Sequence, residues 1–251
     1  MIFCDAAQLK NKVRHQFNRA ASTYDHNNHI QIQALIRILK CIVKRRKQFK
    51  TVIDLGCGTG ESTVGLLNTI QYEYMLAVDI ADQLLDLAVK KCDGYQVQFL
   101  NADFDAVNFK NNCFDLMMIN MGLQWSLQLP QTLKQLSNSL QVGGILAFTM
   151  PLVGTFIELA ADKTNPFVHG EHMIHLLATL GFSQIEFKTY IEQQRFESEV
   201  LRLKSIKAVG ATTLLPKMND NNNVLINHNH LAHDPTLTYR IGIFIAIKGE
   251  P

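Results

Sequence analysis

The sequence predicts an α/β protein built on an open, mostly parallel sheet with helices on both faces. Three observations support this prediction. Strand-like and helix-like segments alternate along the 251 residues, a glycine-rich turn joins an early apolar run to a helix, and a final strand-like run has no crossover before it. The length and the 47% hydrophobic content suffice for a single domain, residues 1–251, with a large core.

The expected strands are short apolar runs bounded by turn residues. They are Thr51–Leu55, Tyr74–Val78, Gln96–Leu100, Phe114–Asn120, Ile145–Met150, Gln184–Tyr190 and Leu237–Ile247. Amphipathic segments predict helices at Gln8–Ala21, Ala34–Lys44, Ser62–Leu67, Ala81–Lys90, Leu129–Leu140, Gly170–Leu180 and Glu197–Val209. Because no crossover precedes the last run, we expect its strand to be antiparallel.

Three stretches exceed the simple alternation of strands and helices. Residues 1–45 precede the first strand and predict an N-terminal helical cap. Residues 151–180 and 191–235 are long connections, which we expect to form a lid and substrate-binding insertions over the open edge of the sheet. Within the second, the polar run Asn219–Asn223 predicts a mobile loop.

The segment DLGCGTG, residues 54–60, is the most informative of the chain. Its glycines lack a Cβ, so the backbone can turn sharply and come close to a ligand at the start of a helix. Asp79 closes the next apolar run, where its carboxylate can accept both ribose hydroxyls of a nucleoside. The spacing is GxGxG with Asp54 ahead of it, not the GxGxxG of dinucleotide enzymes. This pattern is typical of S-adenosylmethionine-dependent methyltransferases of the Rossmann-like class.

In sheets of this kind ligands lie beyond the carboxyl ends of the strands. Asp103 follows the third strand and can accept a hydrogen bond from the adenine amine while Phe104 packs on the base; the alternative is an aspartate that caps a turn. After the fourth strand, Gln124 is a candidate for the reaction chamber, and Trp125 belongs either to the chamber or to the core. If the N-terminal helix folds across the site, Tyr24 can reach the methionine carboxylate or the substrate; otherwise this helix is a packed amphipathic cap.

Composition excludes several classes of function. The net charge of +2 argues against nucleic-acid binding, and no apolar run reaches membrane-spanning length. The N-terminus lacks the features of a signal peptide, and the five scattered cysteines predict reduced thiols, so we expect a cytoplasmic protein. Two histidine groups, at 169–175 and 228–233, lack a zinc-site spacing, so no metal is expected.

The chain resembles the malonyl-[acyl-carrier protein] O-methyltransferases that open biotin synthesis in bacteria. The similar segments are FNRAASTYD at Phe17–Asp25, DLGCGTG at Asp54–Gly60, GLQW at Gly122–Trp125, LAFTMPLVGTFIEL at Leu146–Leu159, and LRLKSIKAVGA at Leu201–Ala211. The glycine motif is generic, whereas GLQW and the late segment are specific. The chain departs from the family pattern at Ser126, Met150–Leu152 and Asn108–Lys110. These differences bear on the predicted substrate site more than on the predicted cofactor site.

The motifs and the resemblance together predict the site residues. The expected cofactor-binding residues are Arg19, Tyr24, Gln31, Asp54, Gly56, Gly58, Gly60, Asp79, Ile80, Asp103, Phe104, Asn120 and Leu123. Tyr24 and Gln124 are the expected catalytic residues. Gln124, Trp125, Arg202, Lys204 and Lys207 are the expected substrate-binding residues, the three cations serving either the malonyl carboxylate or an acidic carrier protein.

The resemblance implies methyl transfer from S-adenosylmethionine to the free carboxylate of a malonyl thioester on acyl carrier protein, or on coenzyme A, with S-adenosylhomocysteine as product. We expect a monomer. A carboxylate with a pKa near roughly 4 is ionised at neutral pH, so no general base is needed. The alternative is a methyltransferase of a free small-molecule carboxylate or of a quinone precursor. A protein that binds the cofactor without catalysis is a further alternative, which the intact glycine motif disfavours.

Overall fold

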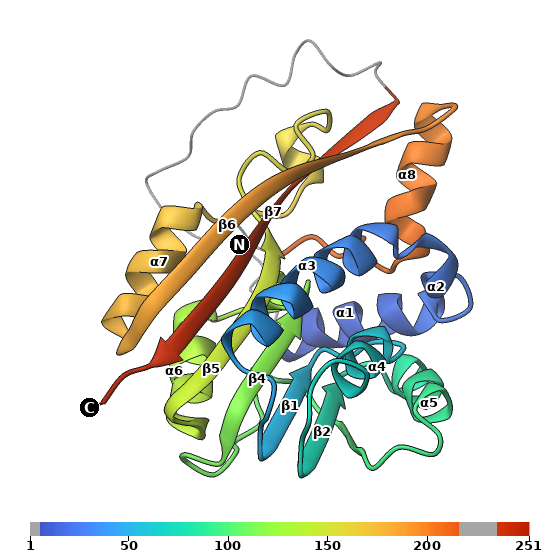
Figure 1. The fold of residues 1–251 in the computed structure, drawn as a ribbon. Coiled ribbons are helices and arrows are strands. Elements are labelled where there is room, and N and C mark those ends of the chain that lie inside the picture. Colours follow the sequence, from blue (N-terminus) through green and yellow to red (C-terminus); the bar gives the residue numbers. More distant parts are fainter. Residues whose placement is uncertain (1–5, 216–234, 251) are drawn as a thin grey trace.

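The computed structural model describes residues 6–215 and 235–250, which form a seven-stranded sheet with helices on both faces (Figure 1). The strands are β1 Thr51–Leu55, β2 Tyr74–Asp79, β3 Gln98–Asn101, β4 Phe114–Asn120, β5 Leu140–Pro151, β6 Phe182–Arg195 and β7 Thr236–Lys248. Their order is β3-β2-β1-β4-β5-β7-β6, and β7 runs antiparallel to both of its neighbours while the other pairs are parallel. The predicted Rossmann-like methyltransferase sheet with an antiparallel last strand is therefore confirmed.

All helices but the one-turn α2, which was not predicted, occupy the predicted segments, with ends that differ by up to five residues. They are α1 Ala6–Ala20, α2 Tyr24–Asn27, α3 His29–Arg45, α4 Glu61–Leu67, α5 Asp82–Lys91, α6 Leu129–Ser139, α7 Gly170–Thr179 and α8 Glu199–Ala208, with short 3₁₀ turns η1 Leu123–Trp125 and η2 Ala161–Lys163. In the part of the chain that the structure describes, no helix is long and apolar enough to cross a membrane.

Apolar side chains of the central strands alternate between the two faces of the sheet. Val52 and Met118 lie in one cluster with Ile38 of α3, and all three are fully buried. Ile53 and Ile119 lie in the other cluster, which α6 and α7 cover. This alternation with a period of two is what lets every central strand bury both of its faces.

Parts of the two expected lid segments belong to the sheet and to its helical layer. β6 continues to Arg195 because Ile191–Arg195 pairs in register with Thr236–Arg240 of β7, so the start of the 191–235 insertion is strand. Within 151–180, helix α7 buries Met173 and Leu177, four residues apart, in the main core, so this part belongs to the helical layer of the sheet. The predicted mobile run Asn219–Asn223 lies outside the described residues.

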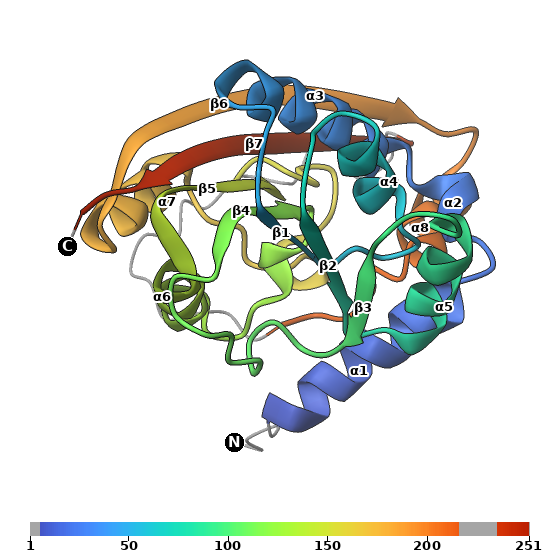
Figure 2. The same ribbon diagram turned by 60° about the horizontal axis from the view of Figure 1, so that its bottom comes forward.

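Of the N-terminal helices, α3 packs on one face of the sheet, whereas α1 and α2, like α8, lie near the ends of strands. Figure 2 shows α1 running beside α5 and past the end of β3. Asn18 fixes this arrangement, because its amide donates to Asp82 Oδ1 (2.7 Å) and its oxygen accepts from Gln83 N (3.1 Å). At the other end, Thr23 Oγ1 donates to the carbonyl of Ala208 (2.9 Å), which joins the cap to α8.

Candidate active site

The glycine loop between β1 and α4 has the backbone conformation that its sequence requires. Gly56, Gly58 and Gly60 have φ values of 73°, 56° and 90°. A Cβ at Gly60 would lie 2.9 Å from the Cα of Ala88, so the loop packs directly on the backbone of α5. Side chains are excluded there both by conformation and by space.

Two buried carboxylates flank this loop. Ser62 Oγ and Thr63 Oγ1 both donate to Asp54 Oδ2 at 2.7 Å, while Asp54 Oδ1 has no hydrogen-bond partner among the described residues. Asp79 accepts from the backbone N–H of Gly58 and of Ala81, each at 2.8 Å. Burial raises the pKa of Asp54 to about 6 and that of Asp79 to about 6. Both groups are therefore mainly ionised at neutral pH and become protonated near pH 6.

Asp103, predicted to meet the adenine, is held by a lysine of the N-terminal helix. Lys10 Nζ lies 3.0 Å from Asp103 Oδ1 and 2.9 Å from Asp105 Oδ2, and it donates to the carbonyl of Trp125 at 3.1 Å. Asp103 Oδ1 also accepts from the N–H of Asp105 (3.0 Å), which is the turn-capping geometry of the alternative reading. Phe104 packs against the main core, with the Lys10 ammonium 4.9 Å from its ring centre.

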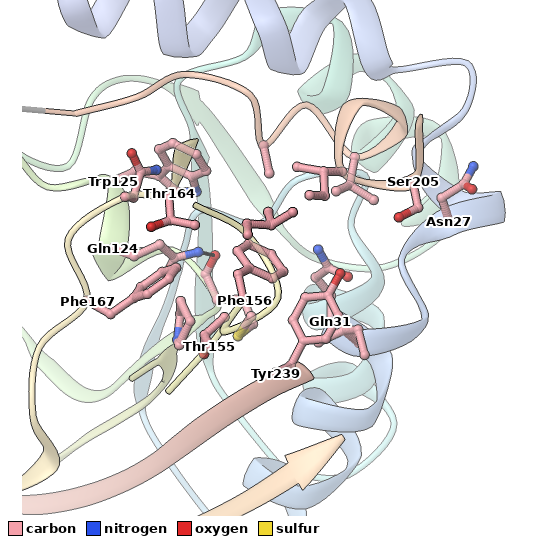
Figure 3. Close-up of a pocket in the computed structure, with 18 of the residues that line it drawn as sticks. Asn27, Gln31, Gln124, Trp125, Thr155, Phe156, Thr164, Phe167, Ser205 and Tyr239 are labelled. Atoms are coloured by element: carbon pink, nitrogen blue, oxygen red, sulfur yellow. Dashed lines mark hydrogen bonds between the residues drawn. The ribbon is translucent and has the colours of Figure 1, made fainter. Parts of the chain in front are cut away.

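A cavity open to solvent, with an empty volume of about 910 Å³ that includes part of this open space, is lined by residues of the N-terminal cap, of the 151–168 connection and of α8 (Figure 3). Of the predicted site residues, Tyr24, Gln31, Gln124 and Trp125 line it. Its wall also includes Phe17, Met121, Thr155, Phe156, Lys163, Asn165, Phe167, Gln194, Ser205, Ile206 and Tyr239. Asp54, Asp79, Asp103 and the three glycines lie outside it, so the predicted site divides into a cofactor side at β1–β3 and this cavity.

Two amide side chains present unpaired oxygens at the cavity. Gln31 Oε1 and Gln124 Oε1 are both buried and have no hydrogen-bond partner among the described residues. The Gln124 amide nitrogen donates to the carbonyl of Met121 at 2.6 Å, which fixes the orientation of that side chain. Buried polar atoms are normally paired, so these oxygens mark positions where a ligand's donor can bind.

Tyr24 connects the two sides of the site. Its hydroxyl lies 3.9 Å from the position that a Cβ on Gly58 would take, and its ring lines the cavity. Burial, followed by the nearby charge of Asp79, raises the pKa of Tyr24 above its ordinary value, so the phenol stays protonated at neutral pH. Tyr24 is therefore a hydrogen-bond donor at this position.

Two of the four described non-glycine residues with left-handed backbone lie on the cavity wall. Met121 and Phe156 both line the cavity and both have left-handed φ values, 53° and 59°. Met121 N donates to the carbonyl oxygen and to Oγ1 of Thr149, each at 3.0 Å, and Phe156 N donates to the carbonyl of Thr238 at 2.7 Å. Non-glycine residues keep such conformations only where their surroundings enforce them, which is common at functional sites.

The remaining predicted cofactor residues have varied surroundings. Asn120 is satisfied within the protein, since it donates to the carbonyl of Gln31 (3.0 Å) and accepts from Thr149 Oγ1 (2.7 Å). Leu123 is buried in the core, while the carbonyl of Ile80 accepts from Asn101 (3.0 Å). Arg19 is exposed on the last turn of α1 and does not line the cavity.

The three cations predicted to bind substrate do not reach the cavity. Arg202 is only 4% exposed and pairs with Glu199 at 3.1 Å, whereas Lys204 and Lys207 are exposed on α8. The cavity-facing residues of this helix are Ser205 and Ile206 instead. The expectation that one of the three cations holds a carboxylate inside the cavity is therefore not supported by the geometry.

Several cavity residues were not singled out from the sequence. Among the described lining residues, Lys163 is the one charged side chain, and Phe156 packs between Phe167 (6.0 Å between ring centres) and Tyr239 (4.9 Å). These residues come from the 151–168 connection and from the start of β7. The length of that connection indicated a lid, but only the fold shows that its aromatic residues meet Tyr239.

No cluster of metal-ligating side chains is present among the described residues. The histidines at positions 228, 230 and 233 lie outside them. Cys41, Cys57, Cys92 and Cys113 are free thiols in the described part of the chain.

Comparison with known proteins identifies the family. A family model described as the ubiE/COQ5 methyltransferase family matches residues 6–155. A malonyl-[acyl-carrier protein] O-methyltransferase of Coxiella burnetii is 39% identical over 242 residues, which cover 96% of this chain and 97% of that protein. The chain belongs to the malonyl-[acyl-carrier protein] O-methyltransferase family. The cofactor of this methyltransferase is S-adenosylmethionine.

Solved structures show the same fold. The YcgJ protein of Bacillus subtilis has a TM-score of 0.65 at 12% identity, covering 86% of this chain and all of that one. The N-methyltransferase NodS of Bradyrhizobium japonicum, solved with S-adenosylhomocysteine, has a TM-score of 0.55 at 12% identity over 87% of each chain. At such identities the likeness concerns the fold alone.

The residues of this chain fit the cofactor. The glycine loop brings backbone close to a ligand, and Asp79 stands at the end of β2 with its carboxylate against that loop. The unpaired Oδ1 of Asp54 offers an acceptor for a ligand's donor group, as the cofactor's amino group requires.

Proposed function

We propose that this enzyme transfers a methyl group from S-adenosylmethionine to the free carboxylate of a malonyl thioester on acyl carrier protein. The product is the malonyl methyl ester that primes pimeloyl synthesis for biotin. The name of the Coxiella burnetii relative, which matches nearly the whole chain, supports this acceptor. The single structural observation that supports it most is the absence of a base among the described residues of the cavity wall.

That wall holds no aspartate, glutamate or histidine in the described part of the chain. Its two phenols, Tyr24 and Tyr239, both have pKa values raised above the ordinary tyrosine value, chiefly by burial, so neither accepts a proton at neutral pH. A hydroxyl or ammonium acceptor would need a base to remove its proton. A carboxylate acceptor is already ionised and needs none.

S-adenosylmethionine supplies the electrophilic methyl group when bound. In this proposal Asp79 accepts hydrogen bonds from the ribose hydroxyls, and Asp54 accepts from the amino group. Tyr24 donates a hydrogen bond at the boundary between the cofactor side and the cavity, and Gln124 lines the chamber that the methyl acceptor enters. Rate acceleration then comes from alignment of the two reactants and from exclusion of water by the aromatic wall.

Lys163 is our candidate for the cation that binds the malonyl carboxylate, in place of Arg202, Lys204 and Lys207. It is exposed, lines the cavity, and forms no ion pair with the described residues. The long flexible stem of a lysine allows its ammonium to follow a substrate carboxylate.

Lys204 and Lys207 retain the second predicted role, docking of the acidic carrier protein. Both are exposed on α8, the helix whose neighbouring residues Ser205 and Ile206 line the cavity. A partner bound there would stand close to the cavity and could deliver its phosphopantetheine arm into it. The enzyme is proposed to act as a monomer on this partner, without nucleic acid or membrane.

The deciding experiment measures transfer of label from S-adenosylmethionine to purified malonyl-acyl carrier protein, malonyl-coenzyme A and free trans-aconitate. We expect label on the malonyl thioester, and none when its carboxylate is esterified beforehand. Label on the free acid alone would replace the proposal with the small-carboxylate alternative. Label on neither, with S-adenosylhomocysteine still bound, would refute the malonyl acceptor and leave the family assignment intact.

A further inference from the structure

A cluster of polar side chains fastens the short helix α2 to the glycine loop. Lys91 Nζ lies 2.8 Å from Asp25 Oδ2 and 2.5 Å from Glu61 Oε1. Thr59 Oγ1, within the glycine loop, donates to Asp25 Oδ1 at 2.5 Å. Asn28 Nδ2 also donates to Asp25 Oδ1, at 3.4 Å. The cluster thus joins α2 to the loop, to the start of α4 and to the end of α5.

The helix that carries Asp25 cannot hold its own position. α2 is one turn long, from Tyr24 to Asn27, and its N-cap residue Thr23 makes no capping hydrogen bond to it. A single turn fixes more backbone torsions than it gains in hydrogen bonds, so it depends on contacts outside itself. Asp25 supplies such contacts on the side of the glycine loop.

The position of α2 matters because Tyr24 immediately precedes Asp25. Tyr24 reaches both Gly58 and the cavity, so a small movement of α2 would shift its hydroxyl from the boundary between the two. Asp25 itself does not line the cavity. Any effect of Asp25 on the site must therefore pass through the loop or through Tyr24.

We propose that Asp25 is a positioning residue which, held by Lys91 and Thr59, fixes α2 on the glycine loop and thereby places the Tyr24 hydroxyl. The inference does not depend on which acceptor the enzyme methylates. Asp25 and Lys91 have side chains 41% and 26% exposed, so salt screens their pairing, whereas the Thr59 hydroxyl is buried.

The test compares Asp25→Asn with Glu61→Gln as a matched control. Glu61 contacts the same ammonium and its side chain is 40% exposed, but no described contact joins it to α2. Asp25→Asn should weaken binding of S-adenosylhomocysteine, measured by calorimetry, about tenfold, because it removes a charge-assisted hydrogen bond. Glu61→Gln should change it by less than about twofold. Equal effects of the two substitutions would overturn the proposal.

A double-mutant cycle tests whether Asp25 acts through Tyr24. If it does, adding Asp25→Asn to Tyr24→Phe should cost less than about twofold beyond Tyr24→Phe alone, in binding and in kcat/KM for methyl transfer. A full tenfold loss in the Tyr24→Phe background would show that Asp25 acts separately. The binding measurement tests the role of Asp25 even if malonyl-acyl carrier protein proves not to be the methyl acceptor.

Two further measurements cover the case in which Asp25→Asn folds poorly. Lys91→Met removes the other partner of the ion pair with Asp25 and should reproduce the loss of S-adenosylhomocysteine binding. In the wild type, raising the salt concentration from low to high should weaken binding more than in Lys91→Met, because the screened pair is absent from the variant. Wild-type binding that is insensitive to salt, together with unchanged binding in Lys91→Met, would refute the proposal.

Discussion

The buried carboxylates Asp54 and Asp79 are expected to make the cofactor side of the site depend on pH. Each is removed from water, and burial raises both pKa values to about 6, against 3.8 for an exposed aspartate. Between these values the native protein binds more protons than the unfolded chain. The contribution of these two groups to the stability of the free enzyme therefore falls as pH rises from about 4 to about 6 and is constant above.

Cofactor binding should depend on pH in the opposite direction. Ribose hydroxyls donate to an ionised Asp79, so we expect the affinity for S-adenosylhomocysteine to decrease as pH falls below about 6. Calorimetric titrations between pH 5 and 8 measure this. Asp79→Asn, with no proton to exchange at this position, should bind weakly and with a smaller pH dependence. Affinity that rises on acidification would contradict the assigned role.

Lys163 offers a test of acceptor specificity at a single residue. We expect Lys163→Gln to raise KM for the malonyl thioester roughly fivefold, as for the loss of one exposed ion pair, and Lys163→Arg to restore most of it. The acetyl thioester, which lacks the carboxylate, should inhibit the wild type and Lys163→Gln equally well. A structural defect would weaken both ligands together, and an unchanged KM would remove Lys163 from the site.

At the scale of elements, α8 combines two surfaces in ten residues. Ser205 and Ile206 face the cavity, while Leu203 and Lys204 are exposed. The exposed side is part apolar and part basic, as a surface for an acidic helical partner would be. A carrier protein docked on the exposed side, as proposed above, would be separated from the cavity by this helix.

Removing positive charge from α8 should separate the carrier-protein substrate from the coenzyme A substrate. For Lys204→Gln combined with Lys207→Gln, we expect a severalfold higher KM for malonyl-acyl carrier protein with a weaker dependence on salt, because rim charges act mainly on encounter. KM for malonyl-coenzyme A should not change by the same factor. Lys90→Gln, an exposed lysine on α5, is the control. Equal losses for both substrates would exclude a docking role.

At the scale of the whole molecule, the cofactor side connects elements from the first half of the chain. The glycine loop, α5, the β3–β4 connection and the N-terminal cap all meet there. A ligand that bridges these elements binds the native state alone, so it must stabilise the fold as a unit.

Thermal unfolding measures this linkage. At a concentration one hundred times its dissociation constant, S-adenosylhomocysteine should stabilise the enzyme by about 2.7 kcal/mol and raise Tm by about 5–10 °C. NAD should leave Tm unchanged, since the loop has the methyltransferase spacing. A shift with NAD and none with S-adenosylhomocysteine would contradict the cofactor assignment.

The sequence predicted local elements well because their signals are local. The glycine spacing, the apolar runs and the final antiparallel strand each follow from neighbouring residues, and the fold confirms them. Lys163 and Tyr239 could not be assigned to one cavity, because their meeting depends on how the 151–168 connection crosses β7. Lys204 and Lys207 were predicted to share one face of a helix because they are three residues apart. This spacing does not show whether that face points into the cavity or toward solvent.

The contacts of Lys10 with Asp103 and with the carbonyl of Trp125 have a consequence for how the protein folds during synthesis. Its partners Asp103 and Trp125 lie 93 and 115 residues further along the chain. On the ribosome, α1 therefore emerges long before the residues that it binds. Its apolar face cannot be buried until most of the sheet has been synthesised. Since distant contacts close late, the first helix to be translated should be among the last to dock.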